Sequence, residues 1–126
     1  MEFTQGVRFD SLGLTEEVQR ALKKKNIEES TPVQVGCIPP MREWKDVIAK
    51  APTGTGKTFA FGIPIIEHID PESEEVQAVI MAPTRELAMQ ITAELRDLAV
   101  FMSGIRVVCL YGGAPIGKQI DALKKK

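Results

Sequence analysis

The sequence is poor in the residues that mark disulfide-rich, membrane-spanning or secreted proteins. It has 2 cysteines in 126 residues and no CxxC pairing, so Cys37 and Cys109 are predicted to be buried free thiols, which suits a reducing cytosol. No apolar run approaches the roughly 18 residues of a membrane span. The N-terminus lacks the basic start and apolar stretch of a secretory signal. These absences favour a cytoplasmic protein without a membrane partner, and they leave a nuclear location open.

An excess of charge of one sign is also lacking. The chain has 16 basic and 17 acidic residues, a net charge of −1, which excludes the strongly basic footprint of histone-like or repressor-like proteins. The lysine runs at 23–25 and 124–126 are interpreted as solvated helix ends, where positive charge is favoured. With 44% hydrophobic and 26% charged residues, the composition is typical of one globular domain. Any nucleic-acid contact must therefore come from local groups.

The first third of the chain is predicted to be helical. Thr15 is expected to cap a first helix. Thr31 is expected to cap a second helix, which has Pro32 at its first position. The Pro39–Pro40 pair is expected to end this second helix, because proline lacks the backbone donor.

Beyond this region, apolar runs alternate with helical patterns. Residues 47–51, 76–82 and 107–111 are predicted strands, and each is followed by a predicted helix. Pro64 is expected to kink or end the first of these helices, and Gly104 to cap the second. This βαβαβα order predicts an α/β fold with a parallel sheet, in which ligands bind beyond the carboxyl ends of the strands. The turns at that edge comprise residues 52–58, 83–86 and 112–115.

The first of these turns carries a phosphate-binding pattern. Residues 51–58 spell Ala-Pro-Thr-Gly-Thr-Gly-Lys-Thr, which departs from the P-loop pattern only in starting with alanine instead of glycine. Gly54 and Gly56 let backbone N–H groups converge on one anion. Lys57 supplies charge for phosphate oxygens, and the Thr58 hydroxyl suits Mg²⁺. A glycine-rich turn without a ligand is the alternative, but the ordered Lys and Thr between a strand and a helix favour nucleotide binding.

Gln34 has two possible roles. With Thr31 it fits a capping box, in which its side chain bonds a backbone donor. Its amide could instead recognise the edge of adenine, because one donor and one acceptor match that base. The residues alone do not separate these roles, and on their own they favour the cap.

Several segments together resemble a known family, from about Phe9 onward. The segment Pro83-Thr84-Arg85-Glu86-Leu87-Ala88-Met89-Gln90 is similar to motif Ia, and residues 51–58 are similar to motif I, of the first RecA-like domain of DEAD-box RNA helicases, which are ATP-dependent. Gly112-Gly113 resembles that family's GG motif. Residues 26–34 resemble its Q motif, with Phe9 as the isolated aromatic upstream.

This resemblance implies a three-layer RecA-like P-loop fold, truncated, with a Q-motif region at 1–44 and a βαβαβα core at 45–126. It implies ATP and Mg²⁺ as cofactors and RNA backbone, without sequence preference, as a partner. The implied ATP-binding residues are Phe9, Ile27, Gln34, Thr53, Gly54, Thr55, Gly56, Lys57 and Thr58, of which Lys57 and Thr58 are catalytic and Thr58 holds Mg²⁺. The implied RNA-binding residues are Pro83, Thr84, Arg85, Gly112 and Gly113.

The Q-motif segment departs from the family pattern. Asn26 replaces the usual glycine, and asparagine tolerates the left-handed turn that is expected there. Ile27 replaces the usual aromatic residue, and Ser30 stands where proline is common. An aliphatic side chain holds a base less well than a ring does, so weaker discrimination of adenine is expected.

The chain is also expected to be the N-terminal part of its domain. It stops before the positions of motifs Ib, II and III, and the second RecA-like domain is absent. The acidic residues between 70 and 75 are interpreted as solvated loop charge and not as a substitute for motif II. We therefore expect a catalytically incomplete, less stable or self-associating piece of an RNA-dependent ATPase and helicase. The alternatives are a nucleotide-binding scaffold that never hydrolyses, and another P-loop enzyme such as a kinase.

Overall fold

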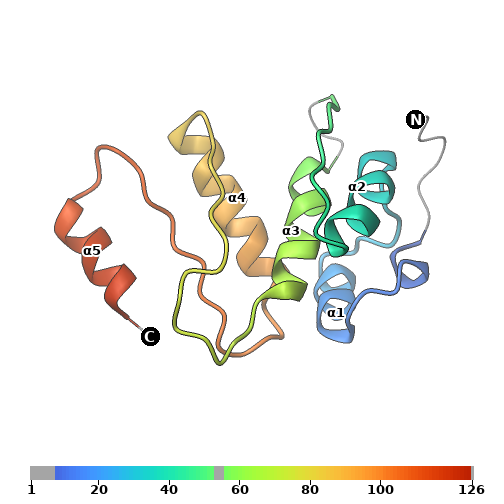
Figure 1. Cartoon of the computed structure of the whole chain (residues 1–126), viewed down its shortest axis with the longest axis horizontal. Helices are drawn as coiled ribbons and strands as arrows, with labels where there is room; N and C mark the ends of the chain where they lie inside the picture. The colour runs from blue at the N-terminus through green and yellow to red at the C-terminus, as the bar shows by residue number, and fades with distance from the viewer. Residues whose placement is uncertain (1–7, 53–55, 126) are drawn as a thin grey trace.

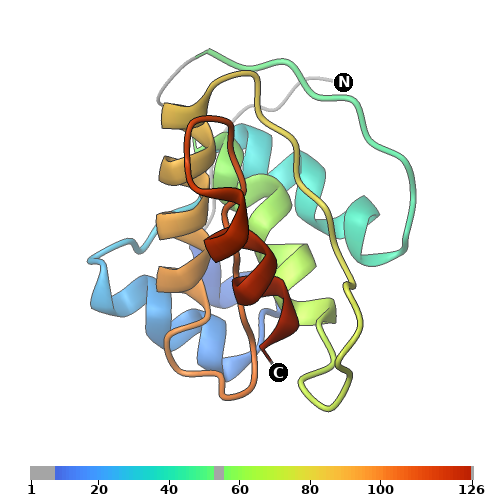
Figure 2. The same cartoon turned by 90° about the vertical axis from the view of Figure 1, so that its left-hand side faces the viewer.

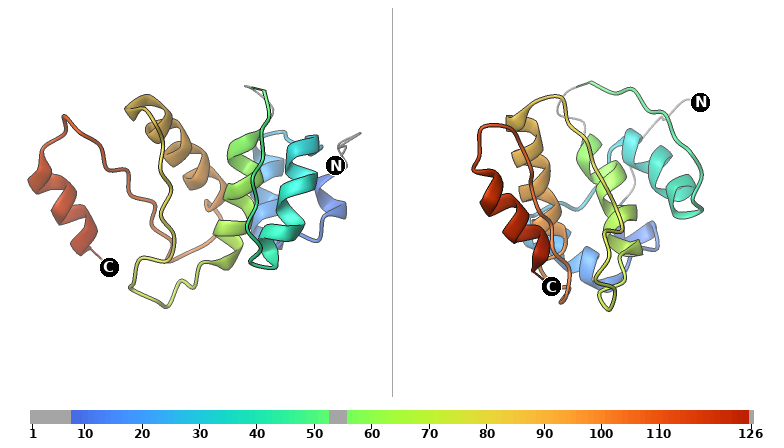
Figure 3. Two further views of the ribbon diagram at one scale, coloured as in Figure 1. Left: turned by 45° about the horizontal axis from the view of Figure 1, so that its top comes forward. Right: turned by 60° about the vertical axis from the view of Figure 1, so that its left-hand side comes forward.

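The computed structural model describes residues 8–52 and 56–125, which form helices joined by long connections (Figure 1). The elements in chain order are a short 3₁₀-helix η1 (Phe9–Ser11), α1 (Glu16–Lys24), α2 (Pro32–Arg42), α3 (Lys57–His68), α4 (Arg85–Leu98) and α5 (Ile116–Lys124). Helices α1, α2 and α3 gather at one end of the molecule, and α5 lies at the other (Figure 3). No helix in the described part is long and apolar enough to cross a membrane.

The predicted starts of α1 and α2 are confirmed. Thr15 is the N-cap of α1, and its hydroxyl accepts a hydrogen bond from the Val18 amide at 3.5 Å. Thr31 occupies the N-cap position of α2, and Pro32 is its first residue. Asn26, in the preceding turn, has a φ of +59°, so the left-handed conformation predicted for it is present.

Proline and glycine predict the helix ends less well. Helix α2 continues through Pro39 and Pro40 to Arg42, so the predicted end at the proline pair is wrong. Helix α3 likewise continues through Pro64 to His68, and α4 ends at Leu98, well before Gly104. Helices α2 and α3 each bury a side chain in the core near their prolines, as Ile38 does in α2. This packing outweighs the loss of a backbone hydrogen bond at proline.

The core lies where the apolar faces of the first helices meet. Val18 and Leu22 of α1 pack with Ile63 of α3 and with Leu95 and Leu98 of α4, all nearly inaccessible to solvent. A smaller cluster of Val33, Cys37 and Ala60 joins α2 to α3. Helix α5 has no buried residue. The buried core of the described residues is thus formed largely by α1 to α4.

Helices α3 and α4 come unusually close at Gly62. A Cβ atom at this position would lie 2.8 Å from Cδ2 of Leu95 and 3.3 Å from Cδ1 of Leu98. A larger residue would have to displace these leucine side chains, since contacts this short are repulsive. The glycine therefore leaves room for Leu95 and Leu98 against α3.

The parallel sheet predicted from the sequence is not formed within residues 8–52 and 56–125. In that part the β-type pairing is an isolated antiparallel bridge between Arg8 and Glu29. The predicted strands at 47–51, 76–82 and 107–111 are extended connections that lie apart from one another (Figure 1). A ladder needs a neighbouring strand about 4.8 Å away, and here none is in place.

Residues 79–82 of the second connection show the side-chain alternation of a strand. Ile80 and Ala82 pack against the helical core, whereas Val79 and Met81 are 77% and 90% exposed. A run that is apolar at nearly every position is typical of a strand that is covered on both faces. Here one face of residues 79–82 meets the helices, and Val76 is 75% exposed.

Side chains bind the backbone of these connections in place of a ladder. The guanidinium of Arg96 donates to the carbonyl oxygen of Val107 at 2.8 Å. The amide of Gln77 bonds both the N–H and the C=O of Asp70, each at 2.8 Å. These bonds satisfy polar backbone groups that would otherwise compete for water.

The starts of helices α3, α4 and α5 lie along the same edge of the molecule (Figures 1 and 2). This is the arrangement that the sequence predicts for them, because each helix is preceded by a connection that runs to that edge. The edge holds the candidate functional residues.

Candidate functional site

The phosphate-loop candidate leads directly into α3. Thr53, Gly54 and Thr55 lie outside the described residues. Gly56 is the N-cap of α3 and has a φ of +78°, a left-handed conformation that only glycine adopts at little cost. Lys57, the first residue of the helix, is exposed. An exposed ammonium group beside the free N–H groups of a helix start can bind phosphate.

Thr58 and Ala51 flank this turn. Thr58 is half-buried in the first turn of α3, and its hydroxyl is a hard oxygen donor. One protein oxygen of this kind suits Mg²⁺, which keeps several waters and takes its other ligands from phosphates. No group of three His, Cys, Asp or Glu side chains that could hold a metal occurs among the described residues. Ala51, at the first position of the pattern, packs its methyl group against the α2–α3 cluster.

Gln34 joins α2 to the phosphate-loop candidate. The side chain is 2% exposed; its Oε1 accepts from the Thr31 amide at 2.8 Å, and its Nε2 donates to the Gly56 carbonyl oxygen at 3.0 Å. The glutamine half of the predicted capping box is thus formed. The Thr31 hydroxyl is buried and has no hydrogen-bond partner among the described residues. Recognition of adenine by Gln34 stays a prediction; the amide has one N–H and one oxygen lone pair beyond the two hydrogen bonds described.

The other predicted adenine contacts belong to the core in this structure. Phe9 is 3% exposed and packs in the main cluster, and its amide donates to the Glu28 carbonyl at 3.0 Å. Ile27 is half-buried against the same cluster, and its amide donates to the Leu22 carbonyl at 3.0 Å. Their predicted roles at the base stay predictions.

The structure brings the two halves of the predicted RNA-binding group together. A Cβ atom on Gly113 would lie 3.0 Å from Nη1 of Arg85, so the guanidinium rests against the glycine turn. Gly113 has a φ of +93°. Thr84 caps α4, and its hydroxyl accepts from the Leu87 amide at 3.1 Å. A guanidinium beside an open glycine backbone can meet a phosphate with little steric cost.

The remaining members of the predicted RNA-binding group are also accessible. Pro83 and Gly112 are exposed, and nothing lies within 4 Å of a Cβ atom placed on Gly112. Arg85 also faces Glu86 at 3.9 Å, an exposed ion pair at the helix start. Pairs of this kind contribute little stability, so the guanidinium remains available to a ligand.

Sequence analysis missed Gln119, which bonds the backbone on both sides of the Gly112–Gly113 turn. Its Oε1 accepts from the Tyr111 amide at 2.9 Å, and its Nε2 donates to the carbonyls of Tyr111 at 3.1 Å and Ala114 at 3.3 Å. No sequence signal marks such a residue, because a glutamine in the first turn of a helix is ordinary.

A second missed group fastens the N-terminal region to α2 and α3. Arg42 donates to the carbonyls of Leu12 at 2.9 Å and Gly13 at 2.7 Å, and its Nη2 pairs with Glu67 Oε1 at 3.0 Å. The other Glu67 oxygen accepts from the Thr15 amide at 2.7 Å. The Glu67 side chain is 6% exposed, so the arginine pairs with a carboxylate that is largely removed from solvent.

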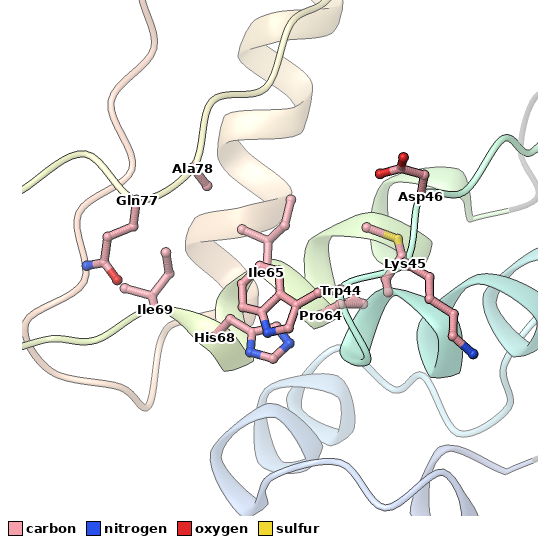
Figure 4. Close-up of a pocket in the computed structure, with 10 residues that line it drawn as sticks. Trp44, Lys45, Asp46, Pro64, Ile65, His68, Ile69, Gln77 and Ala78 are labelled. Atoms are coloured by element: carbon pink, nitrogen blue, oxygen red, sulfur yellow. The ribbon is translucent and has the colours of Figure 1, made fainter.

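A hollow of about 260 Å³ lies at the far end of α3 from Gly56 (Figure 4). Trp44 and His68 line it, with ring centroids 4.2 Å apart, together with Pro64, Ile65 and other largely apolar neighbours. Trp44 has a φ of +61°, an uncommon conformation for a bulky residue. The hollow does not coincide with the predicted nucleotide site.

Comparison with known proteins gives consistent matches. The family described as DEAD/DEAH box helicase matches residues 31–126. The DEAD-box ATP-dependent RNA helicase CshA of Geobacillus kaustophilus is 49% identical over 117 residues, which cover 93% of this chain and 25% of that protein. CshA of Bacillus subtilis is 46% identical over 119 residues, or 94% of this chain and 24% of that protein. The chain thus spans about a quarter of the length of these relatives.

Solved structures agree. A DEAD box protein from Methanococcus jannaschii is 35% identical, with a TM-score of 0.81 over 94% of this chain and 33% of that one. The DEAD-box helicase Mss116, solved with single-stranded RNA and UDP-BeF, is 39% identical, with a TM-score of 0.83 over 93% of this chain and 26% of that one. The arrangement of helices described above is therefore shared with solved proteins of this kind.

Proposed function

We propose that this chain, which belongs to the DEAD/DEAH box helicase family, supplies the ATP-binding part and some of the RNA contacts of an ATP-dependent RNA helicase. One observation carries the proposal. The start of α3 with Gly56 and Lys57, and the contact of Arg85 with Gly113, lie on the same edge of the molecule. One edge can therefore present a nucleotide and an RNA backbone to the rest of the enzyme.

The nucleotide would be held at the start of α3. Lys57 would bind the β- and γ-phosphate oxygens, Thr58 would hold Mg²⁺, and residues 53–56 would donate backbone N–H groups. Bound ATP with its Mg²⁺ supplies the phosphoryl group for hydrolysis. Gln34 would read adenine, and with Ile27 beside the base in place of a ring we expect modest selectivity for it.

RNA would bind through its backbone, beside α4. The Arg85 guanidinium would pair with a phosphate, and Thr84 and Gly113 would let main chain approach the strand closely. Such contacts carry no base information, so binding without sequence preference is expected. The Mss116 structure contains single-stranded RNA by its own description, which supports an RNA ligand for this surface.

Catalysis would need more than these residues. The 126 residues contain no Asp-Glu-Ala-Asp sequence, and positioning and electrostatic stabilisation supply most of the catalysis in phosphoryl transfer. We also propose that residues 45–126 are the first part of a RecA-like core, whose parallel sheet needs further strands, and that residues 1–44 are its Q-motif region. On its own the chain would bind nucleotide without useful turnover.

Titration calorimetry tests the proposal. The chain should bind Mg-ATP and Mg-ADP, and Lys57→Ala should weaken binding by at least about tenfold, because it removes a charged phosphate ligand. Lys118→Ala, an exposed lysine on α5, should bind like the parent chain. Absence of adenine nucleotide binding by folded chain, or equal binding by Lys57→Ala, would contradict the proposal.

A further inference from the structure

We infer that Gln119 is a positioning residue for RNA binding, because it fixes the shape of the turn that carries Gly112 and Gly113. The inference rests on the proposed function, since it concerns the same RNA-contact surface. Gln119 itself would not touch RNA. It would act by holding the glycine turn in the form that faces Arg85.

The hydrogen bonds of Gln119 surround the turn. Tyr111 precedes the two glycines and Ala114 follows them, and one side-chain amide bonds the backbone of both. At Tyr111 it bonds N–H and C=O together, as a neighbouring strand would do. The side chain is half-buried, so water competes less for these bonds than at an open surface.

A turn with two glycines needs such support. Glycine loses more backbone freedom on ordering than any other residue, so an unsupported Gly-Gly turn samples many shapes. RNA would then have to order the turn as it bound, which lowers affinity. Because both ends of the turn are held, Gly113 stays in its left-handed conformation beside the Arg85 guanidinium.

Gln119 can hold the turn only if α5 is itself fixed. Arg106 supplies the second attachment, since its Nη1 donates to the Ala122 carbonyl in the last turn of α5 at 3.1 Å. Helix α5 is thus tied at its first turn by Gln119 and near its end by Arg106. This explains how a helix without buried side chains can orient the loop before it.

The test substitutes Gln119→Met, which keeps the length of the side chain and removes its hydrogen bonds. Gln77→Met is the matched control, because Gln77 makes the same two bonds to the backbone of Asp70, in a loop at the opposite edge. Affinity for a fluorescein-labelled single-stranded oligouridylate would be measured by anisotropy, and affinity for Mg-ATP by calorimetry. Amide hydrogen exchange at Tyr111 would report the hydrogen bond to its N–H directly.

Gln119→Met should weaken RNA binding about tenfold, the effect of losing a little more than one hydrogen bond of net support. It should leave Mg-ATP affinity unchanged, and Gln77→Met should leave both affinities unchanged. Tyr111 exchange should accelerate in Gln119→Met and stay slow in Gln77→Met. RNA affinity within about twofold of the parent in Gln119→Met, or an equal loss in Gln77→Met, would overturn the inference alone. No RNA binding by the parent chain would overturn the proposed function with it.

Discussion

The amide nitrogen of Gln34 lies 3.0 Å from the carbonyl oxygen of Gly56, and the same side chain accepts from the Thr31 backbone. The residue predicted to read adenine is therefore bonded to the turn predicted to bind phosphate. The amide of Gln34 bonds Thr31 through its oxygen and Gly56 through its nitrogen, so a substitution that moves either partner disturbs both hydrogen bonds. The first two predictions use this contact.

Gly56→Ala should destabilise the chain and abolish nucleotide binding. The left-handed φ at this position costs an alanine about 1–2 kcal/mol, and the added Cβ would collide with Nε2 of Gln34. Gly117→Ala is the control, because nothing lies within 4 Å of its Cβ and alanine favours a helix. Urea unfolding and Mg-ADP calorimetry measure the two effects. Near-parental stability of Gly56→Ala would contradict the conformation described for this turn.

Gln34→Glu should keep one of the two hydrogen bonds of the amide and remove the other. The carboxylate can still accept from the Thr31 amide, but it cannot donate to the Gly56 carbonyl and would sit buried beside that oxygen. We expect a loss of about 1–3 kcal/mol in the free energy of unfolding. Gln90→Glu, on the exposed face of α4, is the comparison and should change stability by less than about 0.5 kcal/mol. Equal losses in the two variants would argue against the Gly56 contact.

Gly113→Ala should reduce RNA binding. Its φ of +93° is unfavourable for alanine, and the new methyl group would press on the Arg85 guanidinium, whose Nη1 lies 3.0 Å from the Cβ position. We expect RNA affinity to fall at least about tenfold in a filter-binding assay, the equivalent of about 1.4 kcal/mol. Nucleotide affinity should hold, since α3 is untouched. Unchanged RNA affinity would show that the turn does not contribute.

Arg42→Met should destabilise the chain by about 2–4 kcal/mol, because it leaves the Glu67 carboxylate buried without its cation. The double variant Arg42→Met/Glu67→Leu should recover part of this loss, since it removes the orphaned charge as well. Denaturant unfolding of the parent chain, both single variants and the double variant gives the coupling between the two residues. Additive losses would mean that the pair does not act as a unit.

Cys37 should react slowly in the folded chain. Burial raises the pKa of its thiol, so less of the reactive thiolate forms at a given pH. The unfolded chain ionises first as pH rises, so the stabilisation from this group is complete below the ordinary cysteine pKa of about 8.5 and declines above it. Iodoacetamide labelling followed by mass spectrometry should modify Cys37 more slowly than Cys109, which is only half-buried. Faster labelling of Cys37 would contradict its burial.

Local chemistry made several features predictable. Thr15 and Thr31 mark helix starts because their positions precede apolar residues at helical spacing, and Asn26 adopts the left-handed turn that its side chain tolerates. The prolines at 39 and 40 do not end α2, because the packing of this helix in the core outweighs the preference of proline for a helix end. Cys37 and Cys109 are both free thiols, as predicted, but burial is confirmed for Cys37 alone, because Cys109 is half-buried.

Long-range contacts were not predictable in the same way. The sequence around Arg42 and Glu67 does not indicate that the end of α2 forms an ion pair with the end of α3. Gln119 likewise belongs to no motif that would mark its hydrogen bonds to the backbone. Val76, Val79 and Met81 are exposed, so the apolar runs predict extended segments but not the covering of their faces. They do not say whether each has a neighbour to pair with, because pairing depends on other parts of the chain, and within residues 8–52 and 56–125 no ladder forms.

The missing side chain of Gly62 has a consequence for the helices on both sides of it. Leu95 and Leu98, near the end of α4, pack directly on the backbone of α3 at this point. Helix α3 begins with Lys57 and α4 with Arg85. A side chain at 62 would have to displace the two leucines, and so would disturb the packing between the helices that carry these two cations.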